Sequence, residues 1–191
     1  PSSAAVYGEQ LGEVMLPFTC SASVTDQTKR GLALLHHMTY AGARQIFVEI
    51  VRQQPDCALG YWGQAMSYIH PLWSDPPSSE EFEQGRALAA EAKSRVKNDQ
   101  EKAFVATVAG YYSTDRGAGE KPNLQAFAKA WHKVYQRYPE NTEAASFYAL
   151  ANLATVDPAD KSYRKQKQSA AIAEQVLQVL PTHPGGHHYI I

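Results

Sequence analysis

The chain has only two cysteines, no excess of one charge and no long apolar run, and each shortage excludes a class of protein. Its 18 lysine and arginine residues face 19 aspartate and glutamate residues, which leaves a formal net charge of −1. Without a basic block, the sequence offers no electrostatic surface that would recruit nucleic acid or an anionic membrane. No window approaches the roughly 18 consecutive apolar residues of a transmembrane helix, so we expect no membrane span.

Motifs of known catalytic and metal sites are also scarce. The serines lie in helix caps and loops rather than in a nucleophile elbow. The loop from Gly117 to Gly119 lacks the lysine and hydroxyl residue of a phosphate-binding loop. The sequence contains no HExxH, CxxC or His-x-His pattern. We therefore predict a protein without enzymatic activity.

Apolar residues recur at helical spacing over most of the chain, which predicts an all-α fold. Ser78 and Glu81 have the spacing of a capping box, and Asn98 or Asp99 is expected to cap the next helix. Prolines and glycines interrupt the pattern in two stretches, 71–77 and 113–122. The pattern predicts four helical pairs and the start of a fifth, with helices near 26–38, 43–51, 57–70, 82–96, 99–112, 123–138, 141–155 and 161–180.

The chain divides into two parts by its periodicity. Residues 1–25 show no strong repeat and are expected to form an extended segment that packs on the first hairpin. Residues 26–191 are expected to form one helical repeat domain. The last residues, Tyr189, Ile190 and Ile191, read as the first turn of another hairpin, which indicates truncation at this end. An open end of this kind would favour a homo-oligomer in which these residues complete a neighbour's repeat.

A thirty-four-residue period runs through the first part of the helical region. Gly31 and Ala65 are one period apart. Small and aromatic residues around them fall at fixed offsets, namely Tyr40, Ala43, Phe47, Pro55, Tyr61 and Tyr68. This stretch of about fifty residues closely resembles the tetratricopeptide repeat, and the later pairs resemble it more weakly. The resemblance implies a right-handed α-solenoid of antiparallel helix pairs whose usual work is to bind other proteins.

In that family, the first helix of each pair lines a concave groove. The groove positions carry over to Thr28, Leu32, Leu35, His36, Leu59, Trp62, Met66, Ile69, His70, Glu143, Ser146 and Leu150. None of these is lysine or arginine, so a clamp for acidic peptide ends is not expected. The leading prediction is a scaffold that binds a protein or peptide segment through Leu32, Leu35, His36, Trp62, Met66, Ile69 and His70. The alternative is that the apolar members pack on one another or on the N-terminal segment.

Histidines supply a second functional hypothesis. His36 and His70 are one period apart and are therefore expected to be neighbours on the groove wall. His37 adjoins the first of them, and His187 and His188 form a pair near the C-terminal end. Neighbouring imidazoles can bind Cu(II), Zn(II) or Ni(II), especially with a carboxylate nearby. The alternative is that these side chains are polar helix ends satisfied by backbone carbonyls.

The two cysteines, Cys20 and Cys57, each lie near the start of a helix that begins a pair. In a stacked array both helices start at the same end, so the two sulfurs are expected within disulfide reach. The alternative is two free thiols that act as small apolar residues. A disulfide would indicate an oxidising compartment and hence an exported, periplasmic protein; free thiols would leave a cytoplasmic one.

Overall fold

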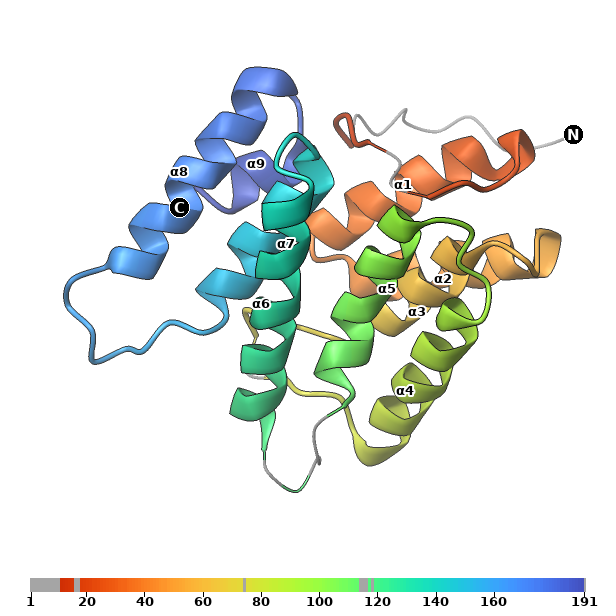
Figure 1. The fold of residues 1–191 in the computed structure, drawn as a ribbon, viewed down its shortest axis with the longest axis horizontal. Coiled ribbons are helices and arrows are strands. Elements are labelled where there is room, and N and C mark those ends of the chain that lie inside the picture. The colour runs from red at the N-terminus through yellow and green to blue at the C-terminus, as the bar shows by residue number, and fades with distance from the viewer. Residues whose placement is uncertain (1–10, 16–17, 74, 114–116, 118, 191) are drawn as a thin grey trace, which may run out of the picture.

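The computed structural model describes residues 11–15, 18–73, 75–113, 117 and 119–190, and its regular elements within these ranges are all helical (Figure 1). The all-α prediction is confirmed. The elements are a short 3₁₀ turn, η1 (Ala22–Val24), followed by α1 (Thr25–His36), α2 (Tyr40–Gln53), α3 (Ala58–Met66), α4 (Ser79–Lys93), α5 (Asp99–Tyr111), α6 (Glu120–Arg137), α7 (Thr142–Leu153), α8 (Arg164–Val179) and α9 (Pro184–His188).

Each helix packs on the next one in the chain, as expected for an array of helical hairpins. Contacts between α1 and α3 and between α3 and α5 join the first helices of successive pairs. The short helix α9 contacts both α7 and α1, so the C-terminal end of the described chain reaches its first helix. The core therefore extends along the whole array.

Phe47 on α2 explains the small residues of the first two pairs. Its side chain is fully buried between α1 and α3. A methyl group added at Gly63 would lie 2.4 Å from the Phe47 ring, and one added at Gly31 would lie 2.8 Å from it. Glycine at these two positions is what lets the helices close on the ring, since real side chains do not approach so closely.

Helix starts follow their capping residues. Ser78 and Glu81 form the predicted capping box at the start of α4, and Asn98 rather than Asp99 caps α5. The prediction ran helix α3 on to His70, but the helix ends at Met66 and a turn follows. Boundaries of this kind are set by local turn hydrogen bonds that the apolar spacing does not report.

Cys20 and Cys57 are joined by a disulfide, with Cα atoms 5.3 Å apart. This bond confirms the pairing and ties the N-terminal segment to the residue that precedes α3. Among the described helices, none combines the length and apolar character needed to cross a membrane. Ile191, part of the expected open end, lies outside the described residues.

Candidate functional site

The apolar residues of the predicted groove lie in the core rather than on an open surface. The side chains concerned are at most 2 % exposed, and they are Leu32, Leu35, Trp62, Met66 and Ile69. The Trp62 indole N–H donates to the carbonyl oxygen of Phe104 at 3.1 Å. This placement matches the alternative that these residues pack on one another and on the N-terminal segment.

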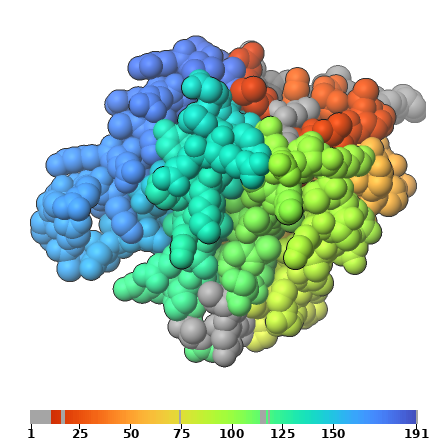
Figure 2. All heavy atoms as spheres, in the orientation of Figure 1, coloured from red at the N-terminus to blue at the C-terminus, as the bar shows by residue number. Residues whose placement is uncertain are grey.

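The N-terminal segment covers this inner face and reaches well beyond the first hairpin. The ring of Phe18 lies 5.6 Å from that of Trp62 and 5.9 Å from that of Phe104. In the space-filling view, red N-terminal atoms lie against green atoms of α5 and teal atoms of α7 (Figure 2). Of the side chains predicted to line a groove, Trp62 is therefore in contact with the chain's own N-terminal residues.

Two buried glutamates hold this segment through its main chain. The N–H of Met15 donates to Glu143 Oε1 at 2.9 Å, and the N–H of Thr19 donates to Glu101 Oε1 at 2.7 Å. Glu101 also accepts from the N–H of Lys97 and belongs to the N-terminal turn of α5. A buried carboxylate needs several such donors, because leaving it unpaired is costly.

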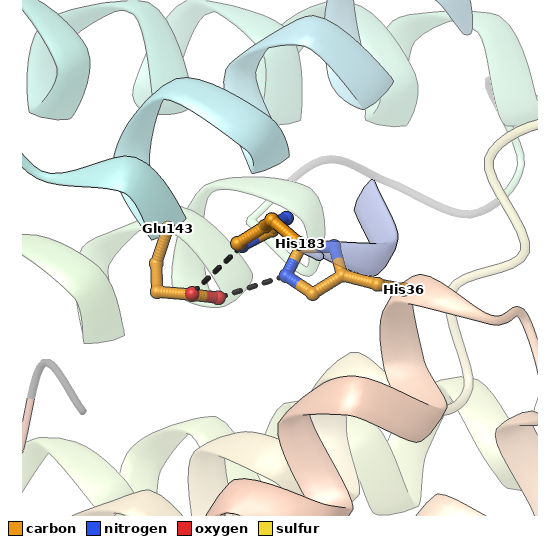
Figure 3. A group of neighbouring side chains, drawn as sticks. All are labelled: His36, Glu143 and His183. Carbon is orange, nitrogen blue, oxygen red and sulfur yellow. Dashed lines mark hydrogen bonds and ion pairs between the residues drawn. The ribbon is translucent and has the colours of Figure 1, made fainter. Parts of the chain in front are cut away.

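His36, Glu143 and His183 form the one group of three metal-ligating side chains found among the described residues (Figure 3). Glu143 Oε2 lies 2.8 Å from His36 Nε2, and Oε1 lies 2.9 Å from His183 Nε2. The ligand atoms all lie within 4.8 Å of one another, and the side chains are 0 % exposed. One carboxylate thus bridges two imidazoles inside the protein.

Three elements distant in sequence supply these side chains. His36 is the last residue of α1, and Glu143 lies in the first turn of α7, which Asn141 caps. His183 is the N-cap of α9, where its Nδ1 accepts a hydrogen bond from the N–H of Gly186 at 3.2 Å. The cluster therefore depends on α9 lying against α1 and α7.

The surroundings decide where the ring protons sit. Because a backbone N–H can only donate, His183 Nδ1 has no proton, and its Nε2 donates to Glu143. His36 stacks on Phe147 with ring centroids 4.2 Å apart, and its Nδ1 lies 3.1 Å from Tyr189 Oη. Burial raises the pKa of Tyr189 well above its usual value, so this hydroxyl keeps its proton. Tyr189 can therefore donate to His36 or accept from it.

The electrostatics favour an ionised carboxylate beside a neutral ring. Burial alone would raise the pKa of Glu143, but the facing His36 and His183 rings outweigh it and hold the pKa at about 2. Burial also dominates at His36, where it lowers the pKa to about 4 despite the attraction of Glu143. Because His183 Nδ1 accepts the Gly186 N–H and so carries no proton, the cluster with an ionised Glu143 carries one net negative charge.

His70 lies apart from this cluster. Its ring stacks on Tyr40 with centroids 4.4 Å apart, and its Nδ1 lies 3.1 Å from Asp75. Both ring nitrogens of His36 have other partners, so the structure does not join His36 and His70 as the repeat spacing suggested. His36 is the last residue of α1, which contacts α9, whereas His70 follows α3, which contacts α4. The two rings therefore meet different elements.

The C-terminal histidines point to two different partners. His188 Nε2 lies 3.0 Å from His37 Nδ1, whereas His187 Nε2 donates to the carbonyl oxygen of Pro181 at 2.8 Å. The structure thus pairs His188 with His37 rather than with its sequence neighbour.

His183 is the member of the cluster that the sequence analysis missed. A signal for it exists, since Cys57, Asn141 and His183 each follow a proline by two residues and each precede a helix. That offset marks His183 as the first residue of a new pair, on the same end of the array as Glu143. Glu143 itself was expected only as a groove position.

No family model, curated protein or solved structure matches the chain.

Proposed function

We propose that this protein is a metal-binding helical repeat protein that holds a divalent cation, Zn²⁺ in the first place, between His36, Glu143 and His183. The observation that carries the proposal is a fully buried carboxylate bridging two imidazole Nε2 atoms at 2.8 and 2.9 Å. Two imidazoles and a carboxylate are a recurring ligand set for zinc.

Charge supports a cation at this place. Glu143 has two imidazoles and the N–H of Met15 as its partners, and none of these is a lysine or arginine. A single negative charge in the protein interior is costly to bury, and a divalent cation would offset it directly. Imidazole nitrogen with carboxylate oxygen suits Zn(II), Cu(II) and Ni(II) better than Mg(II) or Ca(II), which prefer oxygen alone.

Zinc binding requires the ligand atoms of the cluster to rearrange. Zinc bonds of about 2.0–2.1 Å in a tetrahedron place ligand atoms roughly 3.3 Å apart. The two Glu143 contacts with the histidines are shorter than that by roughly half an ångström, whereas the ligand atoms of the cluster span up to 4.8 Å. The carboxylate would therefore have to move slightly away from the rings, and the most distant ligand atoms would have to approach each other. Glycine at position 185 lets α9 pack closely on His36, because a methyl group there would lie 2.7 Å from His36 Nδ1.

Proton movements accompany binding, because a ring nitrogen must lose its proton before it can bind a metal. At His36 the proton can move to Nδ1, where Tyr189 Oη accepts it at 3.1 Å. At His183 the proton on Nδ1 would face Ser146 Oγ at 3.5 Å, and the bond from Gly186 would be given up. Tyr189 thus plays the orienting part that a metal-bound histidine usually requires.

The test is a zinc titration of chelator-treated protein, followed by native mass spectrometry. Glu143→Gln should abolish the tightly held ion, whereas Glu101→Gln should retain it. Glu101 is the matched control, because it is equally buried and holds the same N-terminal segment but contacts no histidine. Equal zinc contents in the two folded variants would refute the proposal.

The array itself we propose to be a right-handed solenoid of tetratricopeptide-like pairs. Support comes from the consecutive packing of the helices and from Phe47 seated against Gly31 and Gly63, thirty-two residues apart in sequence. Export to an oxidising compartment fits the Cys20–Cys57 disulfide, since such bonds persist there.

A second candidate function is the binding of an extended peptide on the inner face. The observation in its favour is the N-terminal segment, whose main-chain N–H groups at Met15 and Thr19 are bound by Glu143 and Glu101. A labelled peptide of residues 11–19 should bind a chain in which Phe18→Ala weakens the resident segment. No rise in fluorescence anisotropy with that folded variant would remove this candidate.

A further inference from the structure

An open cavity lies beside α9, and none of its lining residues belongs to the buried cluster. Its volume is about 660 Å³, and its lining includes Glu13, His37, His187 and His188. Two of these histidines face each other, with His37 Nδ1 3.0 Å from His188 Nε2 and ring centroids 5.1 Å apart. They are partly buried, whereas the buried cluster has no exposed surface.

The partners of His37 orient its ring for metal binding. Its Nε2 lies 3.0 Å from the carbonyl oxygen of Leu11, and a carbonyl can only accept. The neutral ring therefore carries its proton on Nε2 and presents a lone pair at Nδ1, toward His188. A histidine whose second nitrogen donates to a backbone carbonyl is the usual arrangement of a metal ligand.

His188 completes the pair. Its Nε2 faces the lone pair at His37 Nδ1, so this nitrogen carries the proton of the pair. The Nε2–H of His188 therefore donates to His37 Nδ1. A cation that takes the place of this proton would bind both nitrogens, and the proton would move to His188 Nδ1, so no net charge is lost from the ring.

We propose that His37 and His188 form a second, exchangeable zinc site that loads the buried site. This inference rests on the proposed function of His36, Glu143 and His183. Two protein ligands in an open cavity bind more weakly than three in a closed one, with water completing the coordination, and such a site releases its ion readily.

Helix α9 connects the two sites. His183 begins it and belongs to the buried cluster, while His188 ends it and faces the cavity. Its residue Gly185 lies directly on His36, and the following Tyr189 hydrogen-bonds to the same ring. His36 and His37 are consecutive in the chain, so the two sites are connected both by α9 and by this dipeptide. A displacement of α9 would open the way from one to the other.

The experiment combines zinc stoichiometry with the rate of zinc uptake from a chromophoric chelator. The wild-type chain should bind two ions. His188→Gln should bind one, and that ion should load at least about tenfold more slowly than in the wild type. His132→Gln is the control, because this histidine stacks on Tyr148 away from the cavity and should leave both readings unchanged.

The outcomes separate this inference from the proposed function. If His188→Gln still binds two ions, or loads the buried ion at the wild-type rate, the entry site is refuted while the buried site stands. His37→Gln provides a second variant for the same reading. If Glu143→Gln loads as much zinc as the wild type, the buried site is refuted, and with it any site that supplies it.

Discussion

Two glutamates, Glu101 and Glu143, are fully buried in this protein and differ in their hydrogen-bond partners. Glu101 accepts from main-chain N–H groups and from the Asn98 amide, which are donors without a titratable proton. Glu143 accepts from two imidazoles, whose protons can be exchanged for a cation. The same side chain therefore serves a structural role in one place and offers a ligand in the other.

The cluster makes the metal-free protein sensitive to acid. His36 takes up a proton near pH 6.5 when unfolded but only near pH 4 when folded, and Glu143 does so near pH 4.5 and pH 2. In each case the unfolded chain binds the proton first as the pH falls. The contribution of these two groups to stability is therefore fully present above about pH 6.5 and declines as the pH falls toward 2, by up to about 1.4 kcal/mol per pH unit for each group.

Urea unfolding of chelator-treated protein between pH 7.5 and 4 measures this decline. The variant His36→Gln lacks the first of the two protonations, so its free energy of unfolding should change less between pH 6.5 and 4.5. Parallel profiles for the wild type and the variant would contradict the assignment of a low pKa to His36.

The residues of the cluster show how far sequence reasoning reached. The sequence singled out His36 and placed Glu143 on an inner face, because both follow from helical spacing and the repeat offsets. It paired His36 with His70 because these two share a period of thirty-four residues. A sequence period identifies equivalent positions in successive pairs. It does not reveal contacts between the first and the last helix of the described array, such as the contact of α1 with α9.

At the scale of elements, close packing around Phe47 fixes the first two pairs. Gly63→Ala places a methyl group 2.4 Å from the ring, and the outer end of the ring already lies close to Gly31. We expect a loss of about 1–3 kcal/mol in the free energy of unfolding, as for other overpacked cores. Gly42→Ala is the matched control, because its nearest side-chain atom lies 3.5 Å away.

That control should go the other way. Alanine in a helix interior is favoured over glycine by about 0.5–1 kcal/mol, so Gly42→Ala on α2 should stabilise slightly. Urea titrations of both variants give the comparison. If Gly63→Ala were neutral or stabilising, Phe47 would be able to move aside, and the close approach of these helices would not depend on glycine at position 63.

The N-terminal segment is an element of the fold held by one covalent bond. The Cys20–Cys57 disulfide spans 37 residues, and in the chain-entropy model such a bond stabilises by roughly 3–4 kcal/mol. Reduction should lower the free energy of unfolding by about that amount, measured by urea titration with and without a thiol reductant. The double variant Cys20→Ser, Cys57→Ser should not respond to the reductant; a response there would trace the effect to something other than this bond.

The elements also mark which parts of the fold the sequence could supply. The all-α class, the capping box at Ser78 and the disulfide followed from local spacing and from the shared end of stacked helices. The path of the described residues 11–15 and 18–20 did not, because a segment without periodicity carries no sign of the surface it covers. Its place follows from Phe18, whose ring packs beside Trp62, and from main-chain bonds to two distant glutamates.

At the scale of the whole molecule, α9 brings the end of the described array back to its beginning. An array of stacked pairs normally has contacts only between neighbours, so its two ends are free. Here α9 packs on α1 as well as on α7 and α8, and the cluster of His36, Glu143 and His183 lies at that junction. Any ligand bound there would therefore join the first pair to the last.

Zinc binding should for this reason stabilise the whole chain rather than one hairpin. A ligand that binds only the folded state at about one hundred times its dissociation constant adds about 2.7 kcal/mol. For a chain of this size, that corresponds to a rise in Tm of roughly 5–10 °C. Thermal melts of chelator-treated protein with and without zinc measure the shift, and Glu143→Gln should show none while Glu101→Gln should show all of it.

Hydrogen exchange then locates the effect. If the ion joins the two ends, amides in α1, α7 and α9 should all become more protected on adding zinc, because none of them can open without breaking the site. Added protection confined to amides around His37 and His188 would place the tight ion in the open cavity instead. The junction would then be held without a metal, by the packing of α9 on α1 and by the hydrogen bonds of Glu143 and Tyr189.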